Sequence, residues 1–359
     1  MFTERTSVGL DVHARSVVAA AIDGDTGELF QSRLTPAHDH IVEWVRSLPG
    51  PAAVAYEAGP TGFGLFRALG AAGIRCEVAA PSKLERASGD RVKTDARDAL
   101  LLARRLRMDE VTAVAVPTAE CEAARDLVRA REDCRRDLTR TRHRVNGLLL
   151  RHGVVYSQGR AWTGRHDQWL RGITFPQPST QRALGDYYEA TLMMAARRDR
   201  LDADIAALAA TSQFAPLVAR LACLRGVSTL TAFALAVEIG DWHRFTGGSI
   251  GSFVGLVPTE YSSGGATSRG PITRAGNTHV RRLLIEAAWH HRKPYRVTQR
   301  MQRRWEQATP AAARRGDKGN RRLHHRWAVF DARSKKPVVA NTAIARELAS
   351  WCWSLAVMD

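Results

Sequence analysis

The order of strand and helix patterns in the first hundred residues most limits the fold of this chain. Three short runs come first, SVGLDV, SVVAAAID and LFQSRL, with the turn-rich GDTGE between the second and the third. Short apolar runs bounded by turn residues predict strands, so these runs predict an antiparallel meander. The chain then alternates helix and strand patterns in HDHIVEWVRSL, AAVAYE, FGLFRALGAAG, IRCEVAAP and DARDALLLARRLR.

This alternation adds parallel strands to the meander, and their crossover connections are expected to be right-handed. The resulting order is β-β-β-α-β-α-β-α. It predicts an α/β fold of the RNase H-like type for residues 1–117.

The rest of the chain is predicted to be mostly helical. Residues 118–213 contain two long helical patterns with Arg on one face and Leu, Val and Ala on another, which predict a helical or coiled-coil region. Residues 214–293 begin with two apolar helices broken at Arg225-Gly226-Val227, a turn that resembles a helix-hairpin-helix or an ordinary helix corner. Residues 294–359 form a basic, partly helical tail, in which PAAARRGDKGNRR is predicted to be a mobile linker.

Composition indicates a polyanionic partner. Lys and Arg number 53 against 36 Asp and Glu, a formal charge of +17, which favours nucleic acid and salt-sensitive binding. No apolar run approaches the roughly 20 residues of a membrane-spanning helix, so we expect a cytoplasmic protein associated with the nucleoid. The five cysteines lie far apart without paired spacing, which argues against a disulfide framework or a zinc site.

Four acids are predicted to meet at one edge of the sheet. The strand AAVAYE inserts beside SVGLDV, which brings Glu57 close to Asp11, and Asp95 and Asp98 share a face of the helix that packs there. Converging carboxylates suit one or two Mg²⁺ or Mn²⁺ ions, which also bind phosphate oxygens. The alternatives are an N-cap role for Asp95, a helix-dipole role for Asp98 and a solvated loop position for Glu57.

Basic side chains suit contacts with nucleic-acid phosphates, although each is also typical of a solvated face. The candidates are Arg91, Lys93, Arg129, Arg136, Arg140, Arg144, Arg269, Arg274, Arg281 and Arg282, with Arg321, Arg322, Lys335 and Lys336 in the tail. The segment YSSGGATSRG is predicted to be a flexible loop whose glycines would allow a close approach to phosphate, although composition alone favours an ordinary surface linker.

Long motifs resemble the insertion-sequence 110 family of DEDD transposases over nearly the whole chain. They are GLDVHARS, YEAGPTGFGL, CEVAAPSK and GDRVKTDARDALLLARRLR, then LRGVSTLTAFALAVEIGDWHRF, FVGLVPTEYSSGG and GPITRAGNTHVRRLLIEAAW. The resemblance implies a RuvC-like domain in which Asp11, Glu57, Asp95 and Asp98 bind metal. It also implies a nucleophilic serine, Ser263, with the adjacent Ser262 as the alternative.

The resemblance further implies the reaction and its partners. Ser263 attacks a DNA phosphodiester, and the phosphoserine link conserves the bond energy for strand exchange without ATP. A structured bridge RNA guides the choice of element ends and target, and the acidic and serine sites meet between protomers of a dimer or tetramer that the helical middle region assembles.

Three other functions fit parts of the sequence. A metal-only RuvC-like nuclease or junction resolvase needs only the four acids, and a non-catalytic nucleic-acid-binding protein needs only the positive charge. A sugar-kinase or actin-like ATPase shares the fold class, but its first hairpin usually carries a glycine-containing phosphate loop, and DVHARS has no glycine.

Overall fold

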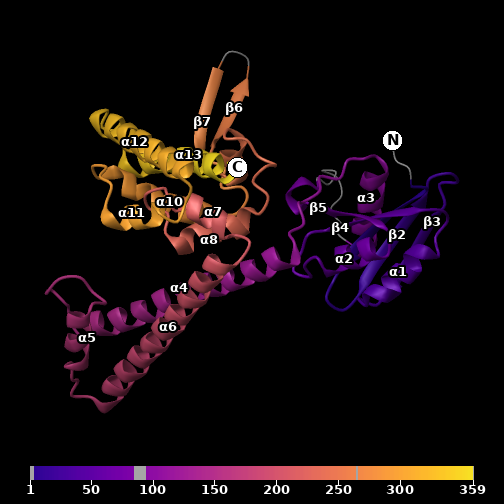
Figure 1. Cartoon of the computed structure of the whole chain (residues 1–359). Coiled ribbons are helices and arrows are strands. Elements are labelled where there is room, and N and C mark those ends of the chain that lie inside the picture. Colours follow the sequence, from indigo (N-terminus) through magenta and orange to yellow (C-terminus); the bar gives the residue numbers. More distant parts are fainter. Residues whose placement is uncertain (1–3, 85–93, 264–265, 359) are drawn as a thin grey trace. The chain divides into compact units, whose positions relative to one another are not determined.

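The computed structural model describes residues 4–84, 94–263 and 266–358, with the backbone alone at 262, 263, 266 and 267. The chain divides into two compact units, Met1–Val116 and Pro117–Asp359. Figure 1 draws both units, and each is described by itself below.

Unit 1 is built on a five-stranded sheet in the order β3-β2-β1-β4-β5. The strands are β1 (Thr6–Val12), β2 (Val17–Asp23), β3 (Leu29–Leu34), β4 (Ala52–Glu57) and β5 (Arg75–Ala79). The first three pair antiparallel, and β4 pairs parallel with both β1 and β5. The predicted meander and its parallel additions are therefore confirmed.

Helices cover both faces of this sheet. One face packs against α1 (His38–Arg46) and α2 (Gly64–Ala71), and Val8, Leu10 and Tyr56 belong to that core. The other face packs against α3 (Asp95–Arg107), where Leu106 contacts small side chains of β4. A short 3-10 helix follows β5 at Pro81–Lys83, and Ala113 bridges back to Ala79.

Helix α3 lies unusually close to β1. A Cβ atom at Gly9 would lie 2.0 Å from the carbonyl oxygen of Ala99 and 2.5 Å from the amide nitrogen of Ala103. Only a residue without a side chain permits this approach of backbone to backbone. At the C-terminal end of α3, Arg107 donates to the carbonyl oxygens of Asp23 and Gly24 at 3.0 and 3.1 Å. The middle of the helix and its last residue are therefore both fixed on the sheet side of unit 1.

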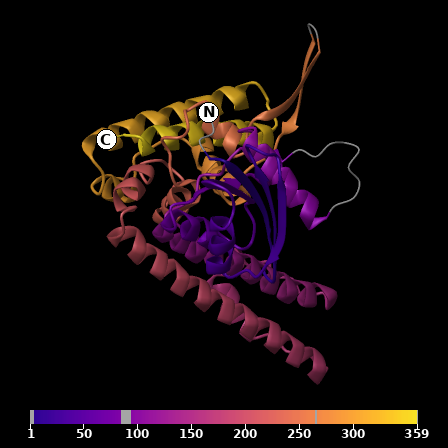
Figure 2. The same ribbon diagram turned by 90° about the vertical axis from the view of Figure 1, so that its right-hand side faces the viewer.

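Unit 2 contains two long helices and a helical core. The long helices α4 (Ala119–Arg151) and α6 (Pro178–Thr211) pack along each other, with α5 (Gly164–Arg171) at one end. The core helices are α7 (Ala215–Leu221), α8 (Thr229–Ile239), α9 (Ser249–Phe253), α10 (Thr278–Ala288), α11 (Gln299–Trp305), α12 (Pro310–Ala332) and α13 (Pro337–Ala356), with a 3-10 turn at Trp289–Arg292. A hairpin of β6 (Pro258–Ser263) and β7 (Ala266–Ile272) projects from them (Figure 1, Figure 2).

The prediction of a mobile linker at PAAARRGDKGNRR was wrong, because this segment is the first half of α12. Thr309 caps the helix and Pro310 occupies its first turn, where proline is tolerated. Its glycines allow close packing: a Cβ at Gly316 would lie 2.6 Å from Cys223 Cβ, and one at Gly319 would lie 2.9 Å from the indole of Trp351. Tertiary packing therefore overrides the low helix propensity of glycine.

The loop predicted for YSSGGATSRG is also corrected. Its described residues belong to β6 and β7, which pair antiparallel at Tyr261 with Ser268 and at Ser262 with Thr267. Among the helices in the described part of the chain, none is long and apolar enough to cross a bilayer.

The contact between Gly9 and α3 yields a stability prediction. Gly9→Ala should lower the free energy of unfolding of unit 1 by about 1–3 kcal/mol, because the added methyl group displaces α3 from β1. Gly70→Ala is the matched control, because a Cβ at Gly70 meets nothing within 4 Å and alanine favours a helix. Urea unfolding followed by circular dichroism measures both. Equal effects of the two substitutions would contradict the role given to Gly9.

Candidate functional site

Two predicted acids lie at the carboxyl ends of neighbouring parallel strands. Leu10 of β1 pairs with Tyr56 of β4, so Asp11 and Glu57 take the next positions along the two strands. Side chains alternate along a strand, and Leu10 and Tyr56 face α1 and α2. Asp11 and Glu57 are therefore on the face that α3 covers.

Helix α3 brings two more acids to this edge. Its N-cap is Thr94, whose hydroxyl accepts from the amide of Arg97, so Asp95 is the first helical residue and the N-cap alternative for it was wrong. Asp98 lies in the same first turn, where the helix dipole favours a carboxylate.

A compact group of possible metal ligands results. In the described ranges, Asp11, His13 and Asp95 each offer a ligand atom, and these atoms lie within 4.8 Å of one another. The Nε2 atom of His13 lies 3.2 Å from Oδ1 of Asp11. Glu57 is exposed and is not a member of this close group, and neither is Asp98. The structure thus gathers part of the predicted set and adds a histidine.

The surroundings of Asp11 disfavour the charged form of its carboxylate. Its side chain is 18% exposed. Burial raises the pKa of Asp11, and Asp95 and Asp98 raise it further, while the hydrogen bond and charge of His13 oppose the shift. A cation among these groups would remove the cost of holding the carboxylate charged.

His13 was missed by sequence reasoning. It stands two residues after Asp11, just beyond the end of β1, and its amide donates to the carbonyl of Ser16 at 3.0 Å. The signal that could have found it is the D-x-H spacing at a strand end, because alternate residues project to the same side.

The two candidate serines end strand β6. Ser263 pairs with Ala266 across the hairpin and Ser262 pairs with Thr267. The preceding Tyr261 is 73% exposed. Near its base, Arg269 lies 3.4 Å from Glu260, and Arg274 is exposed.

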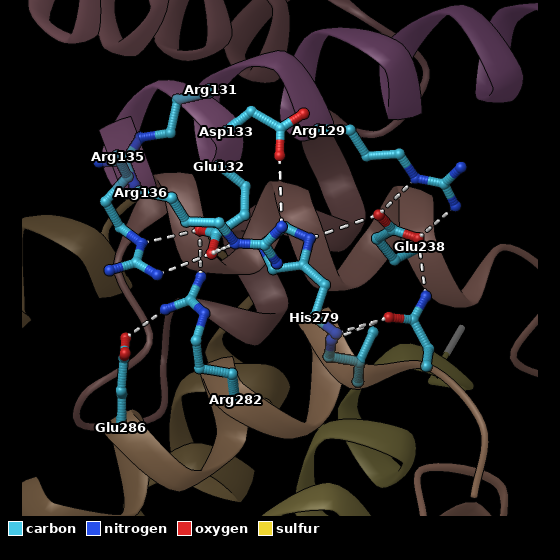
Figure 3. Close-up of polar contacts among 12 residues, drawn as sticks. Arg129, Arg131, Glu132, Asp133, Arg135, Arg136, Glu238, His279, Arg282 and Glu286 are labelled. Atoms are coloured by element: carbon cyan, nitrogen blue, oxygen red, sulfur yellow. Dashed lines mark hydrogen bonds and ion pairs between the residues drawn. The ribbon is translucent and has the colours of Figure 1, made fainter. Parts of the chain in front are cut away.

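A buried ionic network connects α4, α8 and α10 in unit 2 (Figure 3). Glu132 of α4 binds Arg135 at 2.8 Å, Arg136 at 3.3 Å and Arg282 of α10 at 2.5 Å. Glu238 of α8, with a side chain 1% exposed, binds the arginine one turn before Glu132, Arg129, at 3.1 Å.

The N-terminus of α10 completes this network. His279 Nδ1 lies 3.3 Å from Glu238, and Asn277, the N-cap of α10, donates its amide to Glu238 at 2.7 Å. Burial by itself raises the pKa of Glu238, but its hydrogen bonds with His279, Arg129 and Asn277 prevail and lower that pKa to about 2. Each of the two buried glutamates therefore stays charged and holds several elements together.

These contacts divide the predicted nucleic-acid-binding residues into those with partners inside the protein and those with exposed side chains. Arg129, Arg136 and Arg282 bind internal carboxylates, and Arg140 binds Asp137. Arg281 is 9% exposed and donates to the carbonyl oxygens of Val254 and Ala275, so it acts inside the fold. The side chains of Arg144, Arg269 and Arg274 are exposed, and Arg91 and Lys93 lie outside the described residues.

Comparison with known proteins identifies the family. Residues 8–153 match the family model of the DEDD transposases of the IS110 type, and residues 218–306 match the model described as "Transposase IS116/IS110/IS902 family". "Putative transposase y4qE" of Sinorhizobium fredii is 39% identical over 355 residues, which is 97% of this chain and 88% of that protein. The chain belongs to the IS110 family of transposases.

A second relative also matches along most of its length. "Transposase for insertion sequence element IS1533" of Leptospira borgpetersenii is 28% identical over 337 residues, 92% of this chain and 97% of that protein. The IS110-family chain is thus an insertion-sequence transposase, an enzyme of DNA recombination, with a mixed α/β DEDD domain. The predicted family is confirmed.

The ionic network predicts a pH-dependent stability of unit 2. The lowered pKa of Glu238 means that its contribution to stability is present above pH 4.5 and is lost as the pH falls toward about 2. Glu238→Gln should cost about 3 kcal/mol at pH 7, because it removes the charge of a buried carboxylate that binds Arg129, His279 and Asn277, and it should flatten the acid limb of the stability profile. Glu286→Gln removes a carboxylate that is 58% exposed and should cost less than about 1 kcal/mol. Unfolding titrations between pH 7 and pH 3 test this, and unaltered acid sensitivity in Glu238→Gln would contradict it.

Proposed function

We propose that this IS110-family transposase cuts and rejoins DNA through a phosphoserine at Ser263, with a divalent ion held by the acids of an RNase H-like, RuvC-like domain. The single observation that supports this most is the close group of Asp11, His13 and Asp95 at the edge where α3 meets β1 and β4. Residues 1–117 form the RuvC-like domain in this proposal, 118–213 the assembly region, 214–293 the serine domain and 294–359 the basic tail.

The sheet order supports the RNase H-like assignment. Three antiparallel strands followed by two parallel additions, with a helix across the β1–β4 edge, have the connectivity expected for that fold. The helix-hairpin-helix assignment is supported by α7 and α8, which are joined through Gly226 at a positive φ of 83°.

The donor set fits a divalent ion. Asp11 and Asp95 offer carboxylate oxygens, which Mg²⁺ and Mn²⁺ prefer, and His13 holds Asp11 by a hydrogen bond. Asp98 contributes negative charge to the group. Glu57, on the same face of the sheet, belongs to the proposed set by its strand position. When bound, the ion supplies neutralisation of phosphate charge and activation of a hydroxyl.

Ser263 is the proposed nucleophile, and Ser262 is the alternative. A serine hydroxyl is a weak nucleophile unless a base or a metal activates it, so the acids and the serine must act on the same phosphate. The exposure of the neighbouring Tyr261 suits access to a polymer. Arg269 and Arg274 are proposed to bind phosphate oxygens beside it.

The remaining partners in this proposal are the DNA ends of the element, the target DNA and a bridge RNA. They bind to a dimer or tetramer of the chain. The formal charge of +17 supports the nucleic-acid partners, because phosphate backbones dominate such affinities. Exposed Arg144, on α4, is proposed as one such contact. A metal-only nuclease is the second candidate, favoured by the fact that the close group lies wholly within unit 1.

The proposed metal site predicts a stability change that needs no activity assay. Because the pKa of Asp11 is raised, its charged form destabilises the metal-free fold at neutral pH, and Asp11→Asn should raise the melting temperature at pH 7 but not at pH 3. Mg²⁺ or Mn²⁺ should raise the melting temperature of the unsubstituted chain at pH 7 by mass action, and of Asp11→Asn much less. Asp39→Asn, at an exposed position of α1, should leave the metal response intact. Equal metal responses in both variants would exclude Asp11 as a ligand.

The proposed reaction predicts a covalent adduct. Incubated with its element junction DNA, bridge RNA and Mg²⁺, the chain should form a protein–DNA link that denaturing electrophoresis detects. Ser263→Ala should abolish it, and Asp11→Ala should slow its formation by about 100-fold or more, because the ion contributes several kcal/mol to charge stabilisation. Loss in Ser262→Ala alone would move the nucleophile to Ser262. Metal-dependent cleavage without any adduct would favour the metal-only nuclease.

A further inference from the structure

Cationic side chains gather beside the α7–α8 turn, where α8, α10 and α11 meet. Two adjoining cavities of about 400 and 480 Å³ share Ser228, Arg300 and Arg304 as walls. Arg225 and His290 line the first cavity and Arg303 lines the second. We call the two together the arginine cavity.

The turn that forms one wall is rigidly placed. Gly226 has φ +83° and lies so close to α10 that a Cβ there would be 2.4 Å from the carbonyl oxygen of Ala287. The amide of Arg225 donates to Oδ1 of Asn320 at 2.8 Å. The cavity is therefore part of the packed fold, since its wall is fixed by α10 and α12.

Two arginines of the cavity, Arg225 and Arg304, are held by backbone carbonyls. The guanidinium of Arg225 donates to the carbonyl oxygens of Lys293 and Pro294 at 2.9 and 3.0 Å. Arg304 donates to the carbonyl oxygen of Val227 at 2.6 Å. A carbonyl orients a guanidinium without neutralising it, so these contacts leave the positive charge uncompensated.

Carboxylates do not balance this charge. Within the described ranges, no ion pair joins Arg225, Arg300, Arg303 or Arg304 to an acid. Glu286 lines the first cavity, but it binds Arg282 at 2.7 Å. The arginines of the α4–α8–α10 network differ, because Glu132 and Glu238 neutralise them.

Burial and the neighbouring positive charges lower the pKa of two groups in the cavity. Burial lowers the pKa of Arg304, and the charge of Arg300 lowers it further. Partial burial and the charges of Arg225, Lys293 and Arg304 lower the pKa of His290. An anion in the cavity would relieve this repulsion.

We propose that the arginine cavity binds backbone phosphates of a nucleic acid. Four arginines and the hydroxyls of Ser228 and Thr231 surround two adjoining spaces, which suits successive phosphates of a polymer better than one small anion. This inference rests on one part of the proposed function, namely that the chain binds nucleic acid. It assigns phosphate binding to residues outside the acidic group and the serine hairpin.

The test removes two exposed arginines from the full chain. Arg300 and Arg303 are exposed, so Arg300→Ala combined with Arg303→Ala should leave the melting temperature unchanged. Arg314→Ala combined with Lys318→Ala on α12 is the matched control, because it removes the same charge from exposed positions outside the cavity. Binding to duplex DNA of unrelated sequence and to duplex RNA is measured in EDTA, between about 0.05 and 0.2 M salt.

The cavity variant should bind about 10-fold more weakly than the control, and its salt slope on DNA should fall by about 0.9 for each lost phosphate contact. A loss confined to DNA or to RNA would identify that polymer as the ligand. As a second readout, nuclear magnetic resonance should show that the pKa of His290 rises when nucleic acid binds to the unsubstituted chain. Binding equal to the control for both polymers, with an unchanged His290 titration, would overturn the proposal. Since EDTA prevents metal-dependent cleavage, a failed adduct assay would leave this result unaffected.

Discussion

The contact of α3 with β1 at Gly9 is the constraint on which the acidic site depends. Gly9 lies two residues before Asp11, and Ala99, which it touches, lies four residues after Asp95. These short distances along the chain leave little freedom between the contact and the two carboxylates. A larger side chain at Gly9 would lift the helix and separate Asp95 from Asp11. The carboxylates of Asp11 and Asp95 repel each other, so their proximity must be stabilised by other contacts. The close packing of the α3 backbone on β1 at Gly9 supplies this stabilisation.

Unit 2 also holds carboxylates away from water, but there cationic side chains compensate them. Glu132 and Glu238 are buried, and each would be costly if left alone, because a desolvated carboxylate needs partners. Arginines from α4 and α10 supply them, together with His279. Some of the arginines in the positive excess of this chain are therefore paired with carboxylates inside unit 2. A count of basic residues on a helix face could not distinguish such internal partners from surface contacts, which is why Arg129, Arg136 and Arg282 looked like nucleic-acid ligands in the sequence.

The sequence predicted the elements of unit 1 closely because apolar periodicity and turn residues agree there, and α3 has the predicted bounds Asp95–Arg107. Sequence-based prediction failed where one residue type occurs in two kinds of structure, as glycine does in linkers and at close helix contacts. Gly316 and Gly319 resemble linker glycines, but they allow α12 to pack against Cys223 and Trp351. Topology placed Asp11 and Asp95 together, whereas the position of Glu57 relative to them depends on the local path of the chain at a strand end. His13 was missed because it lies just beyond the apolar run of β1, although its D-x-H spacing from Asp11 favours side chains on the same side.

The distribution of charge within unit 2 separates two kinds of cation. Where an arginine meets a buried glutamate, the pair is satisfied, and a polyanion would have to compete with a desolvated carboxylate at short distance. Where the guanidinium groups of Arg225 and Arg304 bind carbonyl oxygens and no carboxylate of the described residues, their positive charge remains for a ligand. Affinity for phosphate should therefore follow the local balance of charge and not the total of +17. The cations that hold the helices of unit 2 together and the cations that remain for a ligand are therefore different residues, and substitution of one set should leave the other in place.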